Sequence, residues 1–231
     1  DDYTQGGTNN KRPDCASLVY TNLIRQYFKN TAPIVLGGIE ASLRRVTHYD
    51  FWSNRLRKPI LFDAKADYLL YGMADNSVVE FAKALDEGIS PLHVKGLSYI
   101  SKEPNAEYIT LPSHQECLDD KLKFMDMFDD FYHNNDPISA RGLCQNVDGR
   151  YLIQNPPAPY LTTEELDDVS ALPFMRDLHP YHHKEGKVKA LETIKFSIST
   201  HQGCYGECNF CAISVHQGRT IRSRSVDSIV K

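Results

Sequence analysis

The sequence predicts an α/β protein, and three observations lead to that class. Residues 33–36 and 67–71 are short apolar runs that each end in glycine, as buried strands often do. Residues 77–85 carry apolar side chains at helical spacing. Residues 194–200 alternate apolar and polar side chains like a further strand, directly before a cysteine-rich segment. Strand, turn and helix in repeated order are typical of a parallel sheet covered by helices.

Composition and charge narrow the possible classes of protein. The 231 residues carry a net charge of −4, and 41% of them are hydrophobic, which is ordinary for a globular protein. This acidic balance argues against a broad nucleic-acid surface, and nothing in the sequence indicates a nucleic-acid partner. No apolar run approaches the ~20 residues of a membrane span, and no signal peptide opens the chain. Six cysteines in a chain of this size favour metal binding in a reducing, cytoplasmic compartment.

Several turn and capping signals accompany the strands and helices predicted in the N-terminal part of the chain. Asp14 is a candidate N-cap for a helix that carries apolar side chains at residues 20–28. The pair Gly37-Gly38 allows either a close approach of the backbone to a ligand or another segment, or a tight turn from strand to helix. Ser77 and Glu80 form the pattern of a capping box.

The middle of the chain combines a helix, a hairpin and a linker. Residues 116–136 predict one long helix whose apolar side chains belong to the core, namely Leu118, Leu122, Met125 and Phe128. Asp148-Gly149 between two apolar runs is a strong signal for a β-hairpin. The proline-rich residues 155–159 predict an extended linker, and Thr162 begins a second capping-box pattern.

The segment richest in chemistry is Cys204-Tyr-Gly-Glu-Cys208-Asn-Phe-Cys211. Iron–sulfur clusters are bound by cysteine thiolates, and a cubane normally takes four of them. Only three are present here, and the nearest upstream cysteine is Cys144. One iron would therefore lack a protein ligand, and an open metal position is typical of a catalytic site.

The spacing C-x3-C-x2-C, with an aromatic residue just before the last cysteine, resembles the signature of the radical S-adenosylmethionine (radical SAM) superfamily. The resemblance implies that Cys204, Cys208 and Cys211 bind a [4Fe-4S] cluster and that Phe210 lies near the adenine of the cofactor. It also implies that S-adenosylmethionine chelates the fourth iron, that the cluster passes one electron to the sulfonium, and that a 5′-deoxyadenosyl radical takes a hydrogen atom from the substrate. No further catalytic residue is assigned.

Three other interpretations of the cysteines remain open. A structural zinc module would use the three thiolates with His201 or His216. A redox dithiol needs C-x-x-C, which Cys208 and Cys211 provide. A non-catalytic electron carrier would hold the cluster without responding to S-adenosylmethionine.

An arginine-rich run follows the cysteines at residues 217–225. The planar fork of arginine pairs with carboxylates, and positive charge nearby favours thiolate ligands. We expect one of these side chains, Arg222, to contact the cofactor. Ser225 and Asp227 predict the cap of a following helix.

The N-terminal region shows a second resemblance. Residues 34–42, 66–85 and 91–99 are similar to the later part of the cobalamin-binding-type Rossmann-like domain that precedes many radical SAM barrels. The D-x-H-x-x-G motif of a cobalt-ligating histidine is absent, so bound cobalamin is not predicted. Residues 37–45, 64–67 and 201–204 together resemble YgiQ-type radical SAM proteins, and this likeness covers most of the chain.

These features predict three regions. Residues 1–115 are expected to form a partial Rossmann-like domain, residues 116–190 a helix, hairpin and linker region, and residues 191–231 the start of a radical SAM β/α barrel with the cluster loop. A full barrel takes roughly 250 residues, so we expect a fragment in which the barrel is begun and not finished. An external electron donor is the expected partner, and the substrate is unknown.

Overall fold

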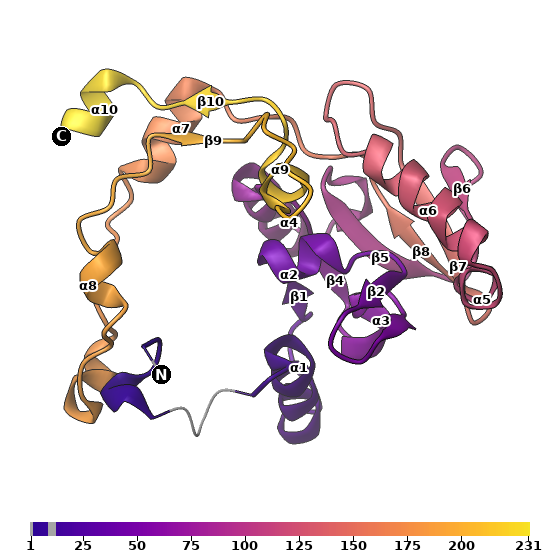
Figure 1. The fold of residues 1–231 in the computed structure, drawn as a ribbon, viewed down its shortest axis with the longest axis horizontal. Coiled ribbons are helices and arrows are strands. Elements are labelled where there is room, and N and C mark those ends of the chain that lie inside the picture. The colour runs from indigo at the N-terminus through magenta and orange to yellow at the C-terminus, as the bar shows by residue number, and fades with distance from the viewer. Residues whose placement is uncertain (1, 9–12) are drawn as a thin grey trace. The chain divides into compact units, whose positions relative to one another are not determined.

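The computed structural model describes residues 2–8 and 13–231, which divide into two compact units. The sheet unit consists of Ser17–Leu161 together with Gly203–Ile221. The terminal unit consists of Thr162–Gln202, Arg222–Lys231 and the described residues up to Ala16. The cysteine segment therefore belongs to the same unit as the N-terminal strands, and each unit is described by itself below (Figure 1).

One mixed sheet of six strands forms the centre of the sheet unit, in the order β1-β4-β5-β8-β7-β6. Only the pairs β1–β4 and β6–β7 are parallel, and the remaining pairs are antiparallel. The strands are β1 (Val35–Leu36), β4 (Tyr68–Leu70), β5 (Leu97–Ser101), β6 (Ile109–Leu111), β7 (Leu143–Val147) and β8 (Arg150–Gln154). The α/β class is confirmed. The two strands predicted at residues 33–36 and 67–71 pair in parallel, as β1 and β4, but the sheet as a whole is mixed and not parallel throughout.

The reversal of β5 explains the mixed sheet. Helix α4 (Asp75–Asp86) follows β4, and the short 3-10 helix η2 (Pro91–His93) then returns the chain to the end at which β4 finishes. Leu97 therefore pairs with Leu70, and β5 runs antiparallel to β4. The apolar runs predicted β1 and β4 correctly, whereas β5 was not predicted from the sequence.

The hairpin of β7 and β8 confirms the prediction from Asp148-Gly149. Both residues adopt positive φ angles, 53° and 78°, as the favoured two-residue hairpin turn requires. The two strands pair in register from Leu143 opposite Gln154 to Val147 opposite Arg150. This hairpin supplies two of the central strands of the sheet.

Among the described residues, one large and one smaller hydrophobic cluster form the core of the sheet unit. Leu69, Leu143 and Leu152 contribute from the strands, and each is almost completely buried. Leu61 belongs to α3 (Ile60–Ala64), and Met127 to α6 (Lys121–His133). Burial of such side chains contributes about 1.5–3 kcal/mol each relative to exposure, before conformational entropy is subtracted.

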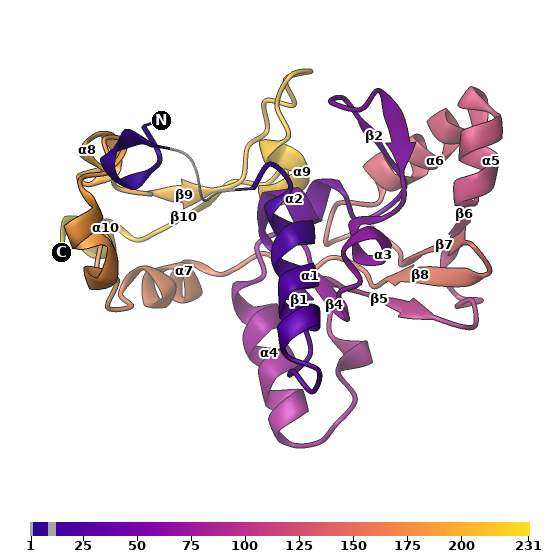
Figure 2. The same ribbon diagram turned by 90° about the horizontal axis from the view of Figure 1, so that it is seen from below.

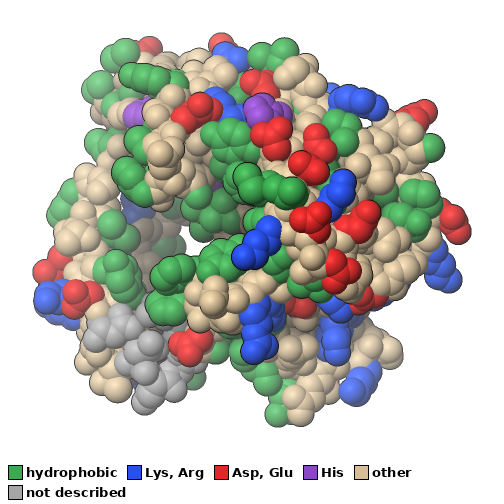
Figure 3. Space-filling model, turned by 45° about the vertical axis from the view of Figure 1, so that its right-hand side comes forward, with side chains coloured by type: hydrophobic (Ala, Val, Ile, Leu, Met, Phe, Trp, Pro, Cys, Tyr) green, Lys and Arg blue, Asp and Glu red, His purple; other side chains and the backbone are tan. Residues whose placement is uncertain are grey.

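The long helix predicted over residues 116–136 is two helices. Helix α5 (His114–Asp119) ends at Asp120, whose extended backbone begins α6 while its side chain accepts a hydrogen bond from the Leu122 amide. This break turns a different face of α6 toward the core, so the prediction of its core residues is wrong. All four predicted core residues are exposed, namely Leu118, Leu122, Met125 and Phe128. Figure 3 shows such hydrophobic side chains at the surface among acidic ones.

Helices α2 and α4 follow the parallel strands β1 and β4. Helix α2 (Gly38–Leu43) begins directly after β1, and Gly38 has φ +84°. Helix α4 begins at Asp75 rather than at a capping box, and Ser77 is buried within it, where its hydroxyl donates to the Lys95 carbonyl. The predicted cap at Ser77 is therefore wrong. Helix α1 (Ala16–Tyr27) begins two residues after Asp14 and exposes several of its apolar side chains.

A small hairpin, β2 (His48–Asp50) with β3 (Arg55–Arg57), projects from the sheet unit (Figure 2). The Asp50 carboxylate accepts hydrogen bonds from the amide and hydroxyl of Ser53, which fixes the turn. Phe51 and Trp52 stand exposed at its tip, and their rings meet edge to face at 6.0 Å.

The terminal unit is built from short elements. They are η1 (Gln5–Gly7), α7 (Thr163–Ser170), η3 (Pro180–Glu185), α8 (Leu191–Ile194), β9 (His201–Gln202), β10 (Arg222–Ser223) and α10 (Val226–Val230). The capping box at Thr162 and the cap at Ser225 are both confirmed. The predicted strand over residues 194–200 does not form, and only β9 pairs, with β10, just before the cysteines. A strand needs a partner for its backbone groups, and no described strand pairs with residues 194–200.

The described part of the chain contains no helix with the length and apolar character that a bilayer crossing requires. The structure confirms a mixed α/β fold. The Rossmann-like identity of residues 1–115, the region from 116 to 190 and the barrel start at 191–231 stay predictions.

We expect Met127→Ala to destabilise the protein far more than Leu122→Ala, although the sequence assigned Leu122 to the core. Met127 is 0% exposed and Leu122 is 68% exposed. Removing the Met127 side chain leaves a cavity and should cost about 2–5 kcal/mol, whereas the surface change should cost less than about 0.5 kcal/mol. Urea unfolding followed by circular dichroism measures both. Equal losses would contradict the orientation of α6.

Candidate functional site

Two hydrogen bonds join the two ends of the cysteine loop, which we define as residues 203–218. The amide of Cys204 donates to the carbonyl of Gly218 at 3.0 Å. The amide of Gly203 donates to the side-chain oxygen of Gln217 at 3.2 Å. Figure 2 shows the loop projecting on the same side of the sheet unit as the β2–β3 hairpin.

Glycine is required at both ends of the loop. Gly203 and Gly218 both have φ +88°, a conformation that side chains disfavour. A Cβ on Gly203 would lie 2.2 Å from the carbonyl oxygen of Thr220, and one on Gly218 would lie 2.5 Å from the ring of Tyr160. The two glycines therefore allow the backbone to turn at both ends of the loop, where a side chain would collide with neighbouring atoms.

The three cysteines of the loop are free thiols. Cys208 is exposed, and Cys204 and Cys211 are half-buried. The amide of Gly206 points to the sulfur of Cys204 at 3.5 Å. A Cβ on Gly206 would lie 3.5 Å and 3.6 Å from the sulfurs of Cys204 and Cys208, so Gly206 is adjacent to both sulfurs.

The donor set of the loop consists of three thiols, which are the ligand type of an iron–sulfur cluster. Among residues 2–8 and 13–231, no group of three or more His, Cys, Asp or Glu side chains is placed to bind a single metal ion. A [4Fe-4S] cluster instead takes one thiolate at each of several irons, so its ligands need not converge on a point. Cys204, Cys208 and Cys211 are the residues that would bind it.

The other cysteines of the sheet unit have no such access. Cys117 and Cys144 are buried in the core. Burial raises the pKa of Cys117 to about 11 and also raises the pKa of Cys144, which keeps both thiols protonated and unreactive. The cluster motif therefore remains a set of three.

Helix α9 (Ile213–Gln217) directly follows the cysteines and packs on α2. Its His216 ring nitrogen Nδ1 lies 2.8 Å from the hydroxyl of Ser42, which also accepts a hydrogen bond from the Gly72 amide at 3.0 Å. A Cβ on Gly72 would lie only 3.6 Å from the His216 carbonyl oxygen. Ser42 thus joins α2, the turn after β4 and the helix after the cysteines.

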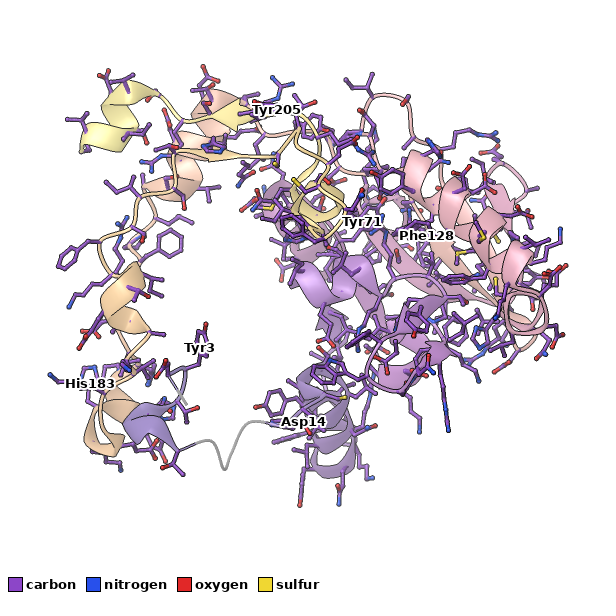
Figure 4. The ribbon with its side chains drawn as sticks, in the orientation of Figure 1. Tyr3, Asp14, Tyr71, Phe128, His183 and Tyr205 are labelled. Atoms are coloured by element: carbon purple, nitrogen blue, oxygen red, sulfur yellow. The ribbon has the colours of Figure 1, made fainter. Side chains whose placement is uncertain are left out.

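Arg45 lies beneath this contact and is completely buried. Its guanidinium is sandwiched between the rings of Tyr71 and Phe131, at 4.4 Å and 4.3 Å from their centroids. It donates to the side-chain oxygen of Gln154 at 2.8 Å, and also to the Ser42 carbonyl and the Asn135 side-chain oxygen. Burial lowers the pKa of Arg45 to about 10 and raises that of Tyr71, which Figure 4 shows inside the unit.

Arg219 connects the loop to α6. Its guanidinium forms an ion pair with Glu207 inside the cysteine loop and lies 4.4 Å above the ring of Tyr132. Partial burial lowers the pKa of Arg219, but its contacts with Tyr132 and Glu207 raise it by more. The pair neutralises the carboxylate of Glu207, the residue directly before Cys208.

The remaining sequence-predicted residues belong partly to the cysteine loop and partly to the terminal unit. Phe210 belongs to the loop and is 92% exposed, and Tyr205, labelled in Figure 4, is exposed as well. Arg222 lies on β10, and His201 on β9, in the terminal unit. The cofactor contacts assigned to Phe210 and Arg222 stay predictions. Because His216 Nδ1 contacts Ser42, only its other ring nitrogen is left for a zinc ion.

Sequence analysis missed Ser42, Arg45 and Tyr132. Each of them contacts a residue that is distant in the sequence. A pattern of neighbouring residues contains no signal for such a contact. Arg44 and Arg45 are adjacent in the sequence, yet only Arg45 is buried. The position of Gly218 beside a tyrosine ring was equally invisible to local spacing.

Residues 1–197 match a family model described as "Radical SAM N-terminal". The chain belongs to this family. The match confirms the radical SAM resemblance, and it ends seven residues before Cys204.

Relatives of this radical SAM chain extend the likeness through the cysteine loop. It is 60% identical to a UPF0313 protein of Fusobacterium nucleatum, 44% to one of Clostridium botulinum and 45% to one of Thermotoga maritima. Each alignment covers 100% of this chain. The same alignments cover 41%, 37% and 41% of the relatives, so the chain spans about two fifths of their length.

Arg45→Ala should destabilise the radical SAM chain strongly, while Arg44→Ala should not. The first change leaves Gln154, Asn135 and the Ser42 carbonyl without their buried donor and should cost about 3–5 kcal/mol. Arg44 is partly exposed in its pairs with Glu40 and Asp50, which should contribute less than about 1 kcal/mol. Urea midpoints compare the two neighbours, and similar losses would contradict the buried position.

Acid should weaken the contact between α9 and α2. Burial, with a smaller effect of Arg45, lowers the pKa of His216 in the folded protein, so the unfolded chain binds its proton more readily. The stability that neutral His216 contributes is complete above the ordinary pKa of about 6.5 and is lost as the pH falls through the lower folded value. His216→Gln should therefore reduce the loss of unfolding free energy between about pH 7.5 and pH 5.5.

Two comparisons make the pH measurement specific. Burial also lowers the pKa of His48 and of His114, so part of the acid effect should remain in the variant. His133→Gln, on the exposed end of α6, is the matched control and should follow the wild-type curve. A His216→Gln curve parallel to wild type would contradict the prediction.

Proposed function

We propose that this chain is the cluster-binding part of a radical SAM enzyme. Cys204, Cys208 and Cys211 bind a [4Fe-4S] cluster, and S-adenosylmethionine occupies the iron that lacks a cysteine. The observation that carries the proposal is a loop with closed ends that presents three free, accessible thiols and no fourth. The relatives are more than twice as long as this chain, and we propose that a protein of that full length performs the reaction.

The loop supports this proposal in two ways. Gly206 lies beside the sulfurs of Cys204 and Cys208 without a side chain of its own, and its amide points to the sulfur of Cys204. Arg219 pairs with Glu207 and so neutralises the carboxylate that directly precedes Cys208. When bound, the cluster and S-adenosylmethionine would supply a one-electron reduction that yields a 5′-deoxyadenosyl radical.

The remaining roles follow from the same proposal. Phe210 is exposed on the loop and available to stack on the adenine, and Arg222 would contact the cofactor carboxylate. An external electron donor reduces the cluster through the exposed side of the loop. We further propose that the first 115 residues form the later part of a cobalamin-binding-type domain without cobalamin and that residues 191–231 begin a barrel, in a cytoplasmic protein.

The test is electron paramagnetic resonance on anaerobically reconstituted, reduced protein, with and without S-adenosylmethionine. A cluster signal that changes shape on addition supports the proposal, because the cofactor must then reach an open iron. A cluster signal that stays unchanged indicates an electron carrier. Bound zinc without iron, found by metal analysis, indicates a structural module and overturns the proposal.

Cys208→Ala should lower the iron content to near zero, because two thiolates cannot retain a cubane that normally takes four ligands. Cys15→Ala is the matched control, since Cys15 is also an exposed free thiol but lies outside the loop. The control should keep the wild-type iron content in a colorimetric assay. If Cys208→Ala keeps the full iron content, the assignment of Cys208 as a cluster ligand is wrong.

A further inference from the structure

We propose that Arg219 is the positioning residue of the cluster loop: it holds Glu207, and with it Cys208, against the rigid core of the sheet unit and neutralises the carboxylate beside the cluster ligand. This inference rests on the proposed function. It adds a residue that neither the cysteine motif nor the sequence resemblance assigned.

The first support is the position of Glu207 within the loop. Glu207 stands between Gly206 and the ligand Cys208, so its backbone orientation sets where the Cys208 side chain begins. Its φ angle is +43°, which is left-handed and costs of order 1 kcal/mol for a residue other than glycine. Such a conformation persists only where surrounding contacts hold it, and the ion pair with Arg219 is such a contact.

The second support is the position of Arg219 at the base of the loop. It directly follows Gly218, whose carbonyl accepts the hydrogen bond of the Cys204 amide. From there its side chain spans the loop to Glu207, twelve residues earlier in the chain. One residue therefore ties the closed base to the segment that carries the second cysteine.

The third support is the surface on which Arg219 lies. The guanidinium stacks 4.4 Å from the Tyr132 ring on α6. The next residue toward the core, Phe131, is buried and stacks on Arg45. The loop is thus connected through Arg219 and Tyr132 to the most constrained part of the fold.

Charge gives the contact a second consequence. An uncompensated carboxylate next to Cys208 would repel the additional electron of a reduced cluster, and net charge is one determinant of cluster potential. Arg219 cancels that charge while its side chain is 24% exposed and Glu207 is 44% exposed, so solvent screens the pair only in part. Loop geometry and cluster potential should therefore depend on the same pair.

The test uses four variants of the reconstituted protein: Arg219→Gln, Glu207→Gln, the double variant and Arg219→Lys. We measure the rate of iron loss to a chelator, the paramagnetic resonance spectrum and the reduction midpoint of the cluster. Arg219→Gln should lose iron about fivefold faster, from the combined loss of the ring contact and the screened ion pair. Its remaining cluster should have a more negative midpoint, because Glu207 is then uncompensated.

The other variants separate position from charge. Glu207→Gln should shift the midpoint in the positive direction, and the double variant should return close to wild type. Arg219→Lys keeps the charge but not the planar contact with Tyr132, so it should keep the midpoint and lose iron faster. If Arg219 has a purely structural role, the variants should lose iron faster without midpoint shifts of opposite sign. That result would overturn the charge assignment.

The matched control is Arg150→Gln. Arg150 also lies over a ring, 5.2 Å from the Phe62 centroid, but at the turn between β7 and β8. It should leave iron loss and midpoint unchanged, and circular dichroism of the metal-free proteins excludes unfolding as the cause of any change.

The outcomes also separate this inference from the proposed function. If wild type takes up no cluster, the proposed function itself fails. If wild type holds the cluster but Arg219→Gln matches it in iron loss and midpoint, only the role of Arg219 is wrong. A variant that keeps the cluster but loses the spectral response to S-adenosylmethionine would reassign Arg219 from positioning to cofactor binding and would also overturn the inference.

Discussion

The buried guanidinium of Arg45 joins the separate parts of the sheet unit. It lies between the rings of Tyr71 and Phe131, and its donors reach the end of α2, strand β8 and the residue Asn135 just after α6. Removing a charge from water is costly unless its donors are satisfied, so these elements must adopt one arrangement for Arg45 to be buried at all. The position of α2, and hence of Ser42, follows from that requirement.

Two sets of contacts connect the cysteine loop to the residues around Arg45. One runs from Ser42 to His216 and fixes α9, which follows the last cysteine. The other runs from Phe131 and Tyr132 to Arg219, which reaches Glu207 before the second cysteine. A loop that is to bind a cofactor needs such support from a rigid scaffold, because side chains on an unsupported loop sample many positions.

Local chemistry was readable from the sequence, and three-dimensional orientation was not. Asp148-Gly149 and Thr162 specify their turn and cap through their own backbone preferences, and the structure contains both. The apolar side of residues 118–128 failed because Asp120 breaks the helix and rotates the face that meets the core. Arg45 was unpredictable for a related reason: its partners, Gln154 and Asn135, lie about a hundred residues away in the chain.

The glycines at the edge of the sheet show how the radical SAM N-terminal fold serves the loop. Ligands of open α/β sheets commonly bind at the carboxyl ends of parallel strands, and glycines follow β1 and β4 at these ends, Gly37-Gly38 after β1 and Gly72 shortly after β4. Gly38 needs its positive φ to turn directly into α2, with no neighbouring atom near its missing Cβ. Gly72 instead lies against the backbone of His216. The edge that binds small molecules in other proteins therefore binds α9 in this one, and through α9 it holds the segment that follows Cys211.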